Sequence, residues 1–116
     1  MSEIEAVIRV VLGAALVDGE IDARELARLK EVAQSVRAEE TLKTVILDLQ
    51  AVQSELVDLA TVLNWVRPAA EILSRAAEQT RFIAVYAIDR IVADDQQVRD
   101  IEMTYRDAVT RIISGE

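Results

Sequence analysis

Acidic residues gather in one short stretch near the amino terminus, at residues 17–25. Its sequence, Val-Asp-Gly-Glu-Ile-Asp-Ala-Arg-Glu, joins two apolar patterns of helical spacing and contains a glycine at which the backbone can bend. The carboxylates of Asp18, Asp22 and Glu25 all fall in this turn. Because carboxylate oxygens are the ligands that hard cations prefer, the stretch predicts an acidic turn that could bind Ca²⁺ or Mg²⁺.

A second acidic stretch, at residues 93–102, is similar to the first. Aligning the two without a gap pairs Asp18 with Asp95 and Glu25 with Glu102. This similarity predicts an internal pseudo-repeat, a helix–acidic turn–helix unit that occurs twice. If the two turns face each other, they could share the six or more oxygens that a hard cation needs. The predicted metal ligands are Asp18, Asp22, Glu25, Asp95 and Glu102, with Asp89 and Asp94 in reserve if the second turn has another register.

Helix capping explains part of this pattern without any ligand. Aspartate is a favoured N-cap residue, and Glu25 three positions after Asp22 would complete a capping box. The stretch also matches only the second half of an EF-hand calcium loop, because Ala14 and Leu16, four and two positions before Asp18, offer no side-chain oxygen. A complete EF-hand loop is therefore excluded, while a shared cation site and a pair of helix caps both stay open.

The composition excludes most catalytic machinery. The 116 residues contain neither histidine nor cysteine, so the chain can form no histidine-based triad, thiol nucleophile, thiolate metal site or disulfide. Paired carboxylates with a divalent ion could still serve an enzyme, but no phosphate cradle or substrate-clamping arginine cluster accompanies them. We therefore expect a protein that is not an enzyme.

Charge and hydropathy limit the partners and the location. The net charge of −8 argues against nucleic acid, whose phosphates need a basic surface. No segment reads as a membrane span, and the amphipathic residues 1–17 do not form a signal peptide. We expect a cytoplasmic protein with a protein partner. Small residues along one predicted helix would also allow a homodimer, although packing within the monomer explains them equally well: Ala76, Ala77, Ala84 and Ala87.

Apolar residues recur every three or four positions along almost the whole chain, and only three glycines and one proline interrupt them. This pattern predicts an all-α fold, a compact single-domain bundle of about six helices over residues 1–116. Pro68 is expected to end one helix at residues 64–68, before a long helix at 70–91. Tyr86 and Tyr105 are expected on core-facing stripes. The predicted core contains Ile8, Leu12, Leu29, Ile46, Leu59, Ile83, Ala87 and Ile101.

Residues 12–25 resemble the signature of the TerB-like family, which is named for a tellurite-resistance protein. The shared pattern is a run of small apolar residues, Asp-Gly, an aliphatic residue, Asp, and a glutamate that opens the next helix. The segment from Tyr86 to Glu102 is similar to the family's later acidic turn, but it lacks the glycine and has extra residues after Asp89. The resemblance implies an all-helical fold with internal pseudo-symmetry and acidic residues that bind metal. It also implies a cytoplasmic or membrane-associated role in stress or tellurite resistance.

Two functions from different classes follow. The first is a non-catalytic TerB-like module that binds a divalent cation through its acidic turns. The second is a structural helical adaptor that docks another protein and has no metal site.

Overall fold

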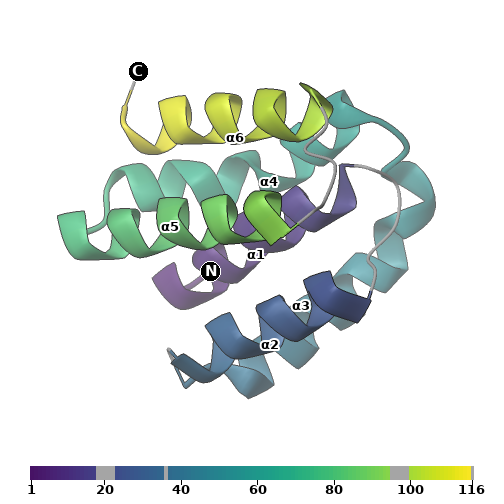
Figure 1. Cartoon of the computed structure of the whole chain (residues 1–116), viewed down its shortest axis with the longest axis horizontal. Helices are drawn as coiled ribbons and strands as arrows, with labels where there is room; N and C mark the ends of the chain where they lie inside the picture. Colours follow the sequence, from purple (N-terminus) through teal and green to yellow (C-terminus); the bar gives the residue numbers. More distant parts are fainter. Residues whose placement is uncertain (18–22, 36, 95–99, 116) are drawn as a thin grey trace.

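A computed structural model of the chain describes residues 1–17, 23–35, 37–94 and 100–115. Within these ranges the chain forms six α-helices, one short 3-10 helix and no strand, which confirms the predicted all-α bundle (Figure 1). The elements are α1 (Glu3–Leu16), α2 (Ala23–Ser35), α3 (Glu39–Val52), η1 (Gln53–Glu55), α4 (Leu59–Ser74), α5 (Glu78–Asp94) and α6 (Asp100–Ile113). None of the described helices is both long and apolar enough to cross a membrane.

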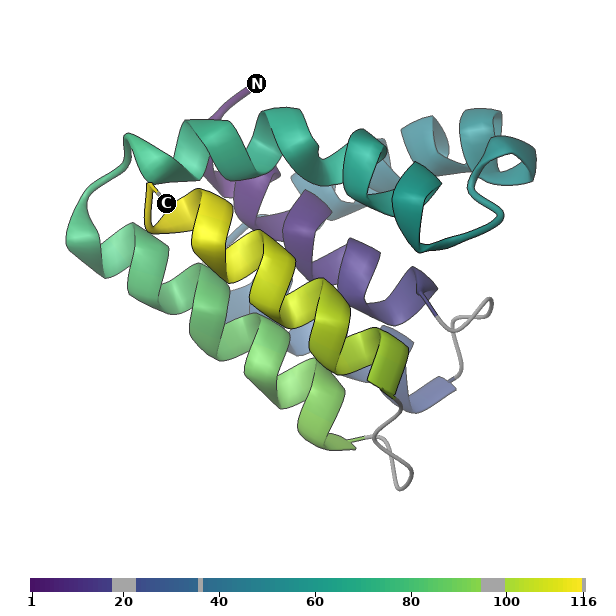
Figure 2. The same ribbon diagram turned by 90° about the horizontal axis from the view of Figure 1, so that it is seen from above.

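Helix α1 forms the centre of the bundle. It packs against α4, α5, α3, α2 and α6, and Figure 1 shows it between α4, α5 and α6 on one side and α2 and α3 on the other; Figure 2 gives the view from above. Ten of its fourteen residues are buried, and the charged residues Glu3, Glu5 and Arg9 are among the four that are not. The helix begins after Ser2, whose hydroxyl oxygen accepts a hydrogen bond from the backbone N–H of Glu5. The single core of the bundle is therefore built around one amino-terminal helix.

Helix α4 differs from the prediction, because it continues through Pro68 and ends at Ser74. A proline inside a helix removes one backbone hydrogen bond, here the bond to the carbonyl of Asn64. Both Pro68 and Asn64 are exposed, so water can solvate that carbonyl. The opposite face buries Val62, Val66, Ala69, Ala70 and Leu73. Burial of this face on both sides of Pro68 stabilises the continuous helix, and the long helix predicted at 70–91 begins at Glu78 instead.

Most of the predicted core is confirmed. Four of its residues are buried: Ile8, Leu12, Leu29 and Ala87. Three more are half-buried and pack against the core: Ile46, Leu59 and Ile101. Ile83 was predicted wrongly, since its side chain is 40% exposed. Its helix directs Ala84, Ala87, Ile88 and Ile91 inward, which leaves Ile83 at the rim.

The small residues that were predicted to allow close approach of a second chain pack inside the monomer at three positions. Ala76, Ala84 and Ala87 are buried in the chain's own core, whereas Ala77 is exposed. Intramolecular packing therefore accounts for most of this stripe, and the homodimer stays a prediction.

Helices α1 and α6 meet at a close contact. Tyr105 of α6 is fully buried, and its hydroxyl donates a hydrogen bond of 2.5 Å to the backbone carbonyl of Val10. Burial raises the pKa of Tyr105 well above its ordinary value, so the phenol stays neutral and keeps its proton. Opposite it lies Gly13, where a Cβ atom would collide with the Tyr105 hydroxyl and lie 2.7 Å from Cγ1 of Val66. The absence of a side chain at Gly13 thus allows the phenol to enter the core.

We predict that Gly13→Ala destabilises the protein. Alanine favours a helix over glycine by about 1 kcal/mol, but overpacking a filled core costs about 1–3 kcal/mol or more. Urea unfolding should show a net loss of stability. Tyr105→Phe should recover part of that loss in the double variant, because it removes the atom nearest to the new methyl group. A more stable Gly13→Ala protein would contradict this packing.

A second prediction concerns the first turn of α4. The side chain of Asp58 accepts a hydrogen bond from the backbone N–H of Thr61 at 2.9 Å, and the Thr61 hydroxyl accepts one from the backbone N–H of Asp58. The bonds from Thr61 lower the pKa of Asp58 below its ordinary value. A folded pKa below the unfolded one contributes stability that is present above the unfolded pKa, 3.8, and is lost as the pH falls through the folded pKa.

Asp58→Asn tests this directly, since asparagine can cap the helix but does not titrate. The difference in melting temperature between wild type and Asp58→Asn should favour wild type near pH 7 and shrink as the pH falls below about 4. A difference that stays constant over this range would show that the charge of Asp58 does not stabilise the cap.

Candidate functional site

The helix ends that flank the two acidic stretches lie at one end of the bundle. They are the carboxyl ends of α1 and α5 and the amino ends of α2 and α6, and both views place them together (Figures 1 and 2). Packing of α1 on α5 and α6, and of α2 on α5, holds them there. The connecting residues 18–22 and 95–99 lie outside the described residues, so the predicted pseudo-repeat of acidic turns is not described itself.

Glu102 is the predicted metal ligand whose side chain the structure describes. It lies in the first turn of α6 and is 4% exposed, which makes it the one buried charged side chain in the described ranges. The other predicted ligands, Asp18, Asp22 and Asp95, lie outside the described residues. Glu25 is part of α2, but its side chain is also outside them. No group of three or more acidic side chains that could hold a metal occurs among the described residues.

The position of Glu102 in the first turn of α6 partly stabilises a negative charge on its side chain. A carboxylate at the amino end of a helix is stabilised by the helix dipole, by roughly 0.3–1 kcal/mol and at most about 2 kcal/mol. Glu102 also has a partner within the protein. Removing an ionised carboxylate from water costs several kcal/mol, so burial at this position requires compensation.

The reserve candidates differ from Glu102. Asp89 of α5 accepts a hydrogen bond from the guanidinium of Arg106 on α6, and this ion pair ties the two helices together. Arg106 also pairs with Asp107 at 3.2 Å. The hydrogen bond and charge of Asp89 raise the pKa of Arg106 above its ordinary value. Asp89 therefore has a structural partner already, and the side chain of Asp94 lies outside the described residues.

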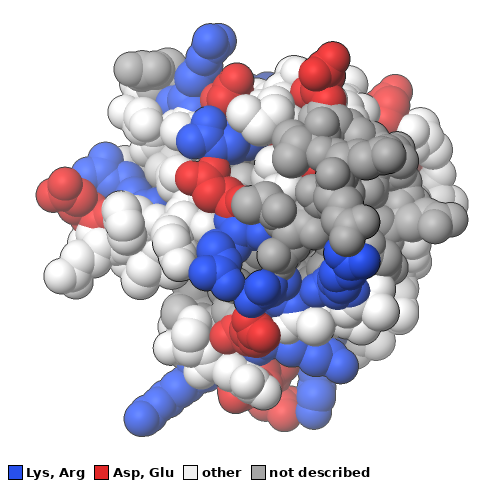
Figure 3. Space-filling model, in the orientation of Figure 1, with Lys and Arg blue, Asp and Glu red and all other residues white. Residues whose placement is uncertain are grey.

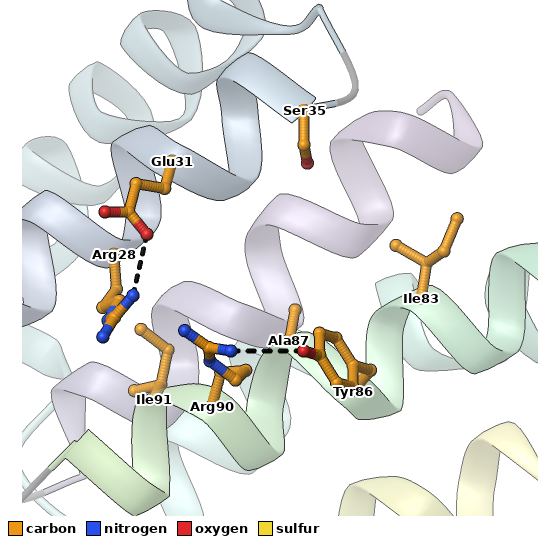
Figure 4. Close-up of a pocket in the computed structure, with 8 residues that line it drawn as sticks. All are labelled: Arg28, Glu31, Ser35, Ile83, Tyr86, Ala87, Arg90 and Ile91. Atoms are coloured by element: carbon orange, nitrogen blue, oxygen red, sulfur yellow. Dashed lines mark hydrogen bonds and ion pairs between the residues drawn. The ribbon is translucent and has the colours of Figure 1, made fainter.

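A groove between α2 and α5 forms a second candidate site, which the sequence did not reveal (Figure 4). Its volume is about 220 Å³. One wall comes from α2 and the other from α5, and the lining residues are Arg28, Glu31, Ser35, Ile83, Tyr86, Ala87, Arg90 and Ile91. Figure 4 shows the two arginines at one end of the groove, and Tyr86 and Ile83 farther along α5. The groove thus combines cations with apolar surface.

The outer face of α5 continues this apolar surface. The rings of Phe82 and Tyr86 stack with centroids 6.2 Å apart, and the two side chains are 68% and 52% exposed. The guanidinium of Arg90 donates a hydrogen bond of 3.2 Å to the Tyr86 hydroxyl and lies 5.9 Å from the centre of that ring. The prediction that Tyr86 belongs to the core is therefore wrong. Residues 82–88 are all apolar, which is more than a single core-facing stripe requires. This excess was the sequence signal that some of these side chains lie outside the core.

The single tryptophan contributes to packing. Trp65 is half-buried against the core, and the guanidinium of Arg9 lies 5.2 Å from its ring centre. Arg9 also pairs with Asp48 of α3 at 2.7 Å, so this contact links three helices.

Comparisons of the chain with protein-family models, with curated proteins and with solved structures found no match. The likeness to the TerB-like family therefore stays a prediction based on the acidic stretches.

Proposed function

We propose that the protein is a non-catalytic TerB-like module that binds a divalent cation at the end of the bundle where the acidic stretches begin and end. The observation that supports this proposal is the burial of Glu102, 4% exposed, in the first turn of α6. The helix dipole and a contact within the protein already stabilise this carboxylate, and a bound cation would add a further favourable interaction.

The proposed ligand set supplies the chemistry that such an ion requires. Ca²⁺ takes six to eight oxygen ligands, whereas Mg²⁺ takes six and keeps several waters. Carboxylates from both acidic stretches, completed by water, would satisfy either ion. Five carboxylates in one place would also repel one another on a chain of net charge −8, and a divalent cation would relieve that repulsion. Cation binding would thus change the stability of this end of the bundle. The resemblance to the TerB-like family adds the proposed setting, a cytoplasmic role in stress or tellurite resistance.

We predict that millimolar Ca²⁺, Mg²⁺ or Mn²⁺ raises the melting temperature of metal-stripped protein in a saturable way, because the ion binds the folded state only. Asp18→Asn and Glu102→Gln should each abolish the shift. Asp18→Asn should also stabilise the metal-free protein or leave it unchanged, since it removes one of the repelling charges. Glu71→Gln is the matched control, because Glu71 is exposed on α4 and its loss should leave the cation response intact.

The capping account predicts a different result. Under that account no cation has a specific effect, and Asp22→Ala costs about 0.5–2 kcal/mol with or without metal. Equal melting curves in chelator and in millimolar cation would rule out the cation site and leave the acidic residues as helix caps.

The second candidate function is a helical adaptor that docks a protein partner. The exposed stack of Phe82 and Tyr86 on α5 favours it, because adjoining exposed apolar side chains mark interaction surfaces. This surface involves none of the predicted metal ligands, so the two functions can be tested separately.

A further inference from the structure

We propose that the α2–α5 groove, with the adjoining Phe82, docks an acidic amphipathic helix of a partner protein. In this proposal an apolar side chain of the partner enters the groove beside Ile83 and Tyr86, and a carboxylate of the partner pairs with Arg90. The inference names the partner class for the adaptor function and does not depend on the cation site.

The exposed side chains of α5 form one continuous face. Gln79, Phe82, Ile83, Tyr86 and Arg90 recur at helical intervals of three and four residues. Phe82, Ile83 and Tyr86 are 68%, 40% and 52% exposed, although the other side of the same helix is buried in the core. Amphipathic helices are bound by laying their apolar face into a hydrophobic groove, and this face of α5 borders one.

The groove itself has a volume of about 220 Å³. A second hollow of about 390 Å³ lies beside it, lined by Glu78, Gln79, Phe82 and Ile83. Ile83 borders both hollows. Two adjoining hollows along one helix fit successive apolar side chains on one face of a bound helix.

The charge of the groove indicates an acidic partner. The chain has a net charge of −8, yet the groove contains two arginines and one glutamate, and Glu78 lines the adjoining hollow. Arg28 pairs with Glu31 at 2.9 Å, whereas the contacts of Arg90 with the described residues are with the neutral hydroxyl and ring of Tyr86. In Figure 3 lysine and arginine side chains gather in the band where α5 faces α2. A guanidinium at the end of an apolar groove is placed to bind a carboxylate through two hydrogen bonds.

Other occupants fit less well. A nucleic acid brings a long row of phosphates, which a protein of charge −8 repels as a whole. A second copy of this chain carries the same net charge and meets the same repulsion. A short acidic helix brings only a few charges and places them at the arginines.

The test uses two synthetic helical peptides of about 18 residues, long enough to form a helix when alanine-rich. Both carry phenylalanine and leucine four positions apart. One has glutamates beside them and the other has lysines at the same positions. Each is titrated in chelator into ¹⁵N-labelled protein, and amide shifts are followed by NMR. We expect shifts in residues 28–35 and 82–91, with the glutamate peptide binding roughly tenfold more tightly than the lysine peptide.

Exposed substitutions then separate charge from apolar contact. Arg90→Glu should reverse the preference between the peptides, and Phe82→Ala should weaken both. The matched controls are Arg67→Glu on α4, with the same charge change, and Leu47→Ala on α3. Leu47 is 66% exposed, close to the 68% of Phe82. Neither control should change binding, and circular dichroism should show the same helix content in every variant.

The proposal would be overturned if the protein bound the two peptides with equal affinity. It would also be overturned if the amide shifts were confined to other helices, or if millimolar peptide caused no amide shift. Self-association that Phe82→Ala abolishes would identify a second copy as the occupant instead. Tighter binding of a single-stranded oligonucleotide of the same charge would identify nucleic acid. If a variant fails to fold, the two peptides with wild-type protein decide the question alone. Because chelator is present throughout, failure of the cation site would leave these results unaffected.

Discussion

Burial of most of α1 by five neighbouring helices is the constraint on which the rest of the structure depends. Ten of its fourteen residues can be buried only if those neighbours approach closely. Gly13 permits one such approach, since the Tyr105 phenol occupies the space that a side chain there would fill. The phenol is satisfied by the Val10 carbonyl, so a large polar side chain is buried without an unpaired group. Helices α4, α5 and α6 are thereby fixed around one axis.

This arrangement gives α5 two different faces. Its inward face consists of small and branched residues such as Ala84 and Ile88, which fit closely against α1. Its outward face keeps Phe82 and Tyr86 in solvent and borders α2 along the groove. The same packing brings the helix ends beside both acidic stretches to one end of the bundle (Figure 2). The two surfaces to which we assign binding roles are thus positioned by one core but differ in residues and chemistry.

Periodic patterns predicted the helical class and most of the core, because three-and-four spacing records which face of each helix is buried. Local rules failed where tertiary packing outweighed them. Pro68 did not end α4, since apolar burial continues on both sides of it. Ile83 and Tyr86 were assigned to the core because α5 is apolar nearly all around, so its pattern cannot show which apolar stripe faces solvent. The α2–α5 groove joins residues more than 45 positions apart, a pairing that spacing along the chain cannot reveal.

Amide hydrogen exchange under native conditions tests the central role of α1 most directly, because it reports the opening free energy of each helix separately. We expect the amides of residues 7–15 to exchange only through global unfolding, with an opening free energy equal to the unfolding free energy from urea denaturation. The amides of α2, which has a polar outer face, should open at lower free energy. Exchange of α1 through local opening, at or below the free energy of α2, would contradict the claim that the fold is built around this helix.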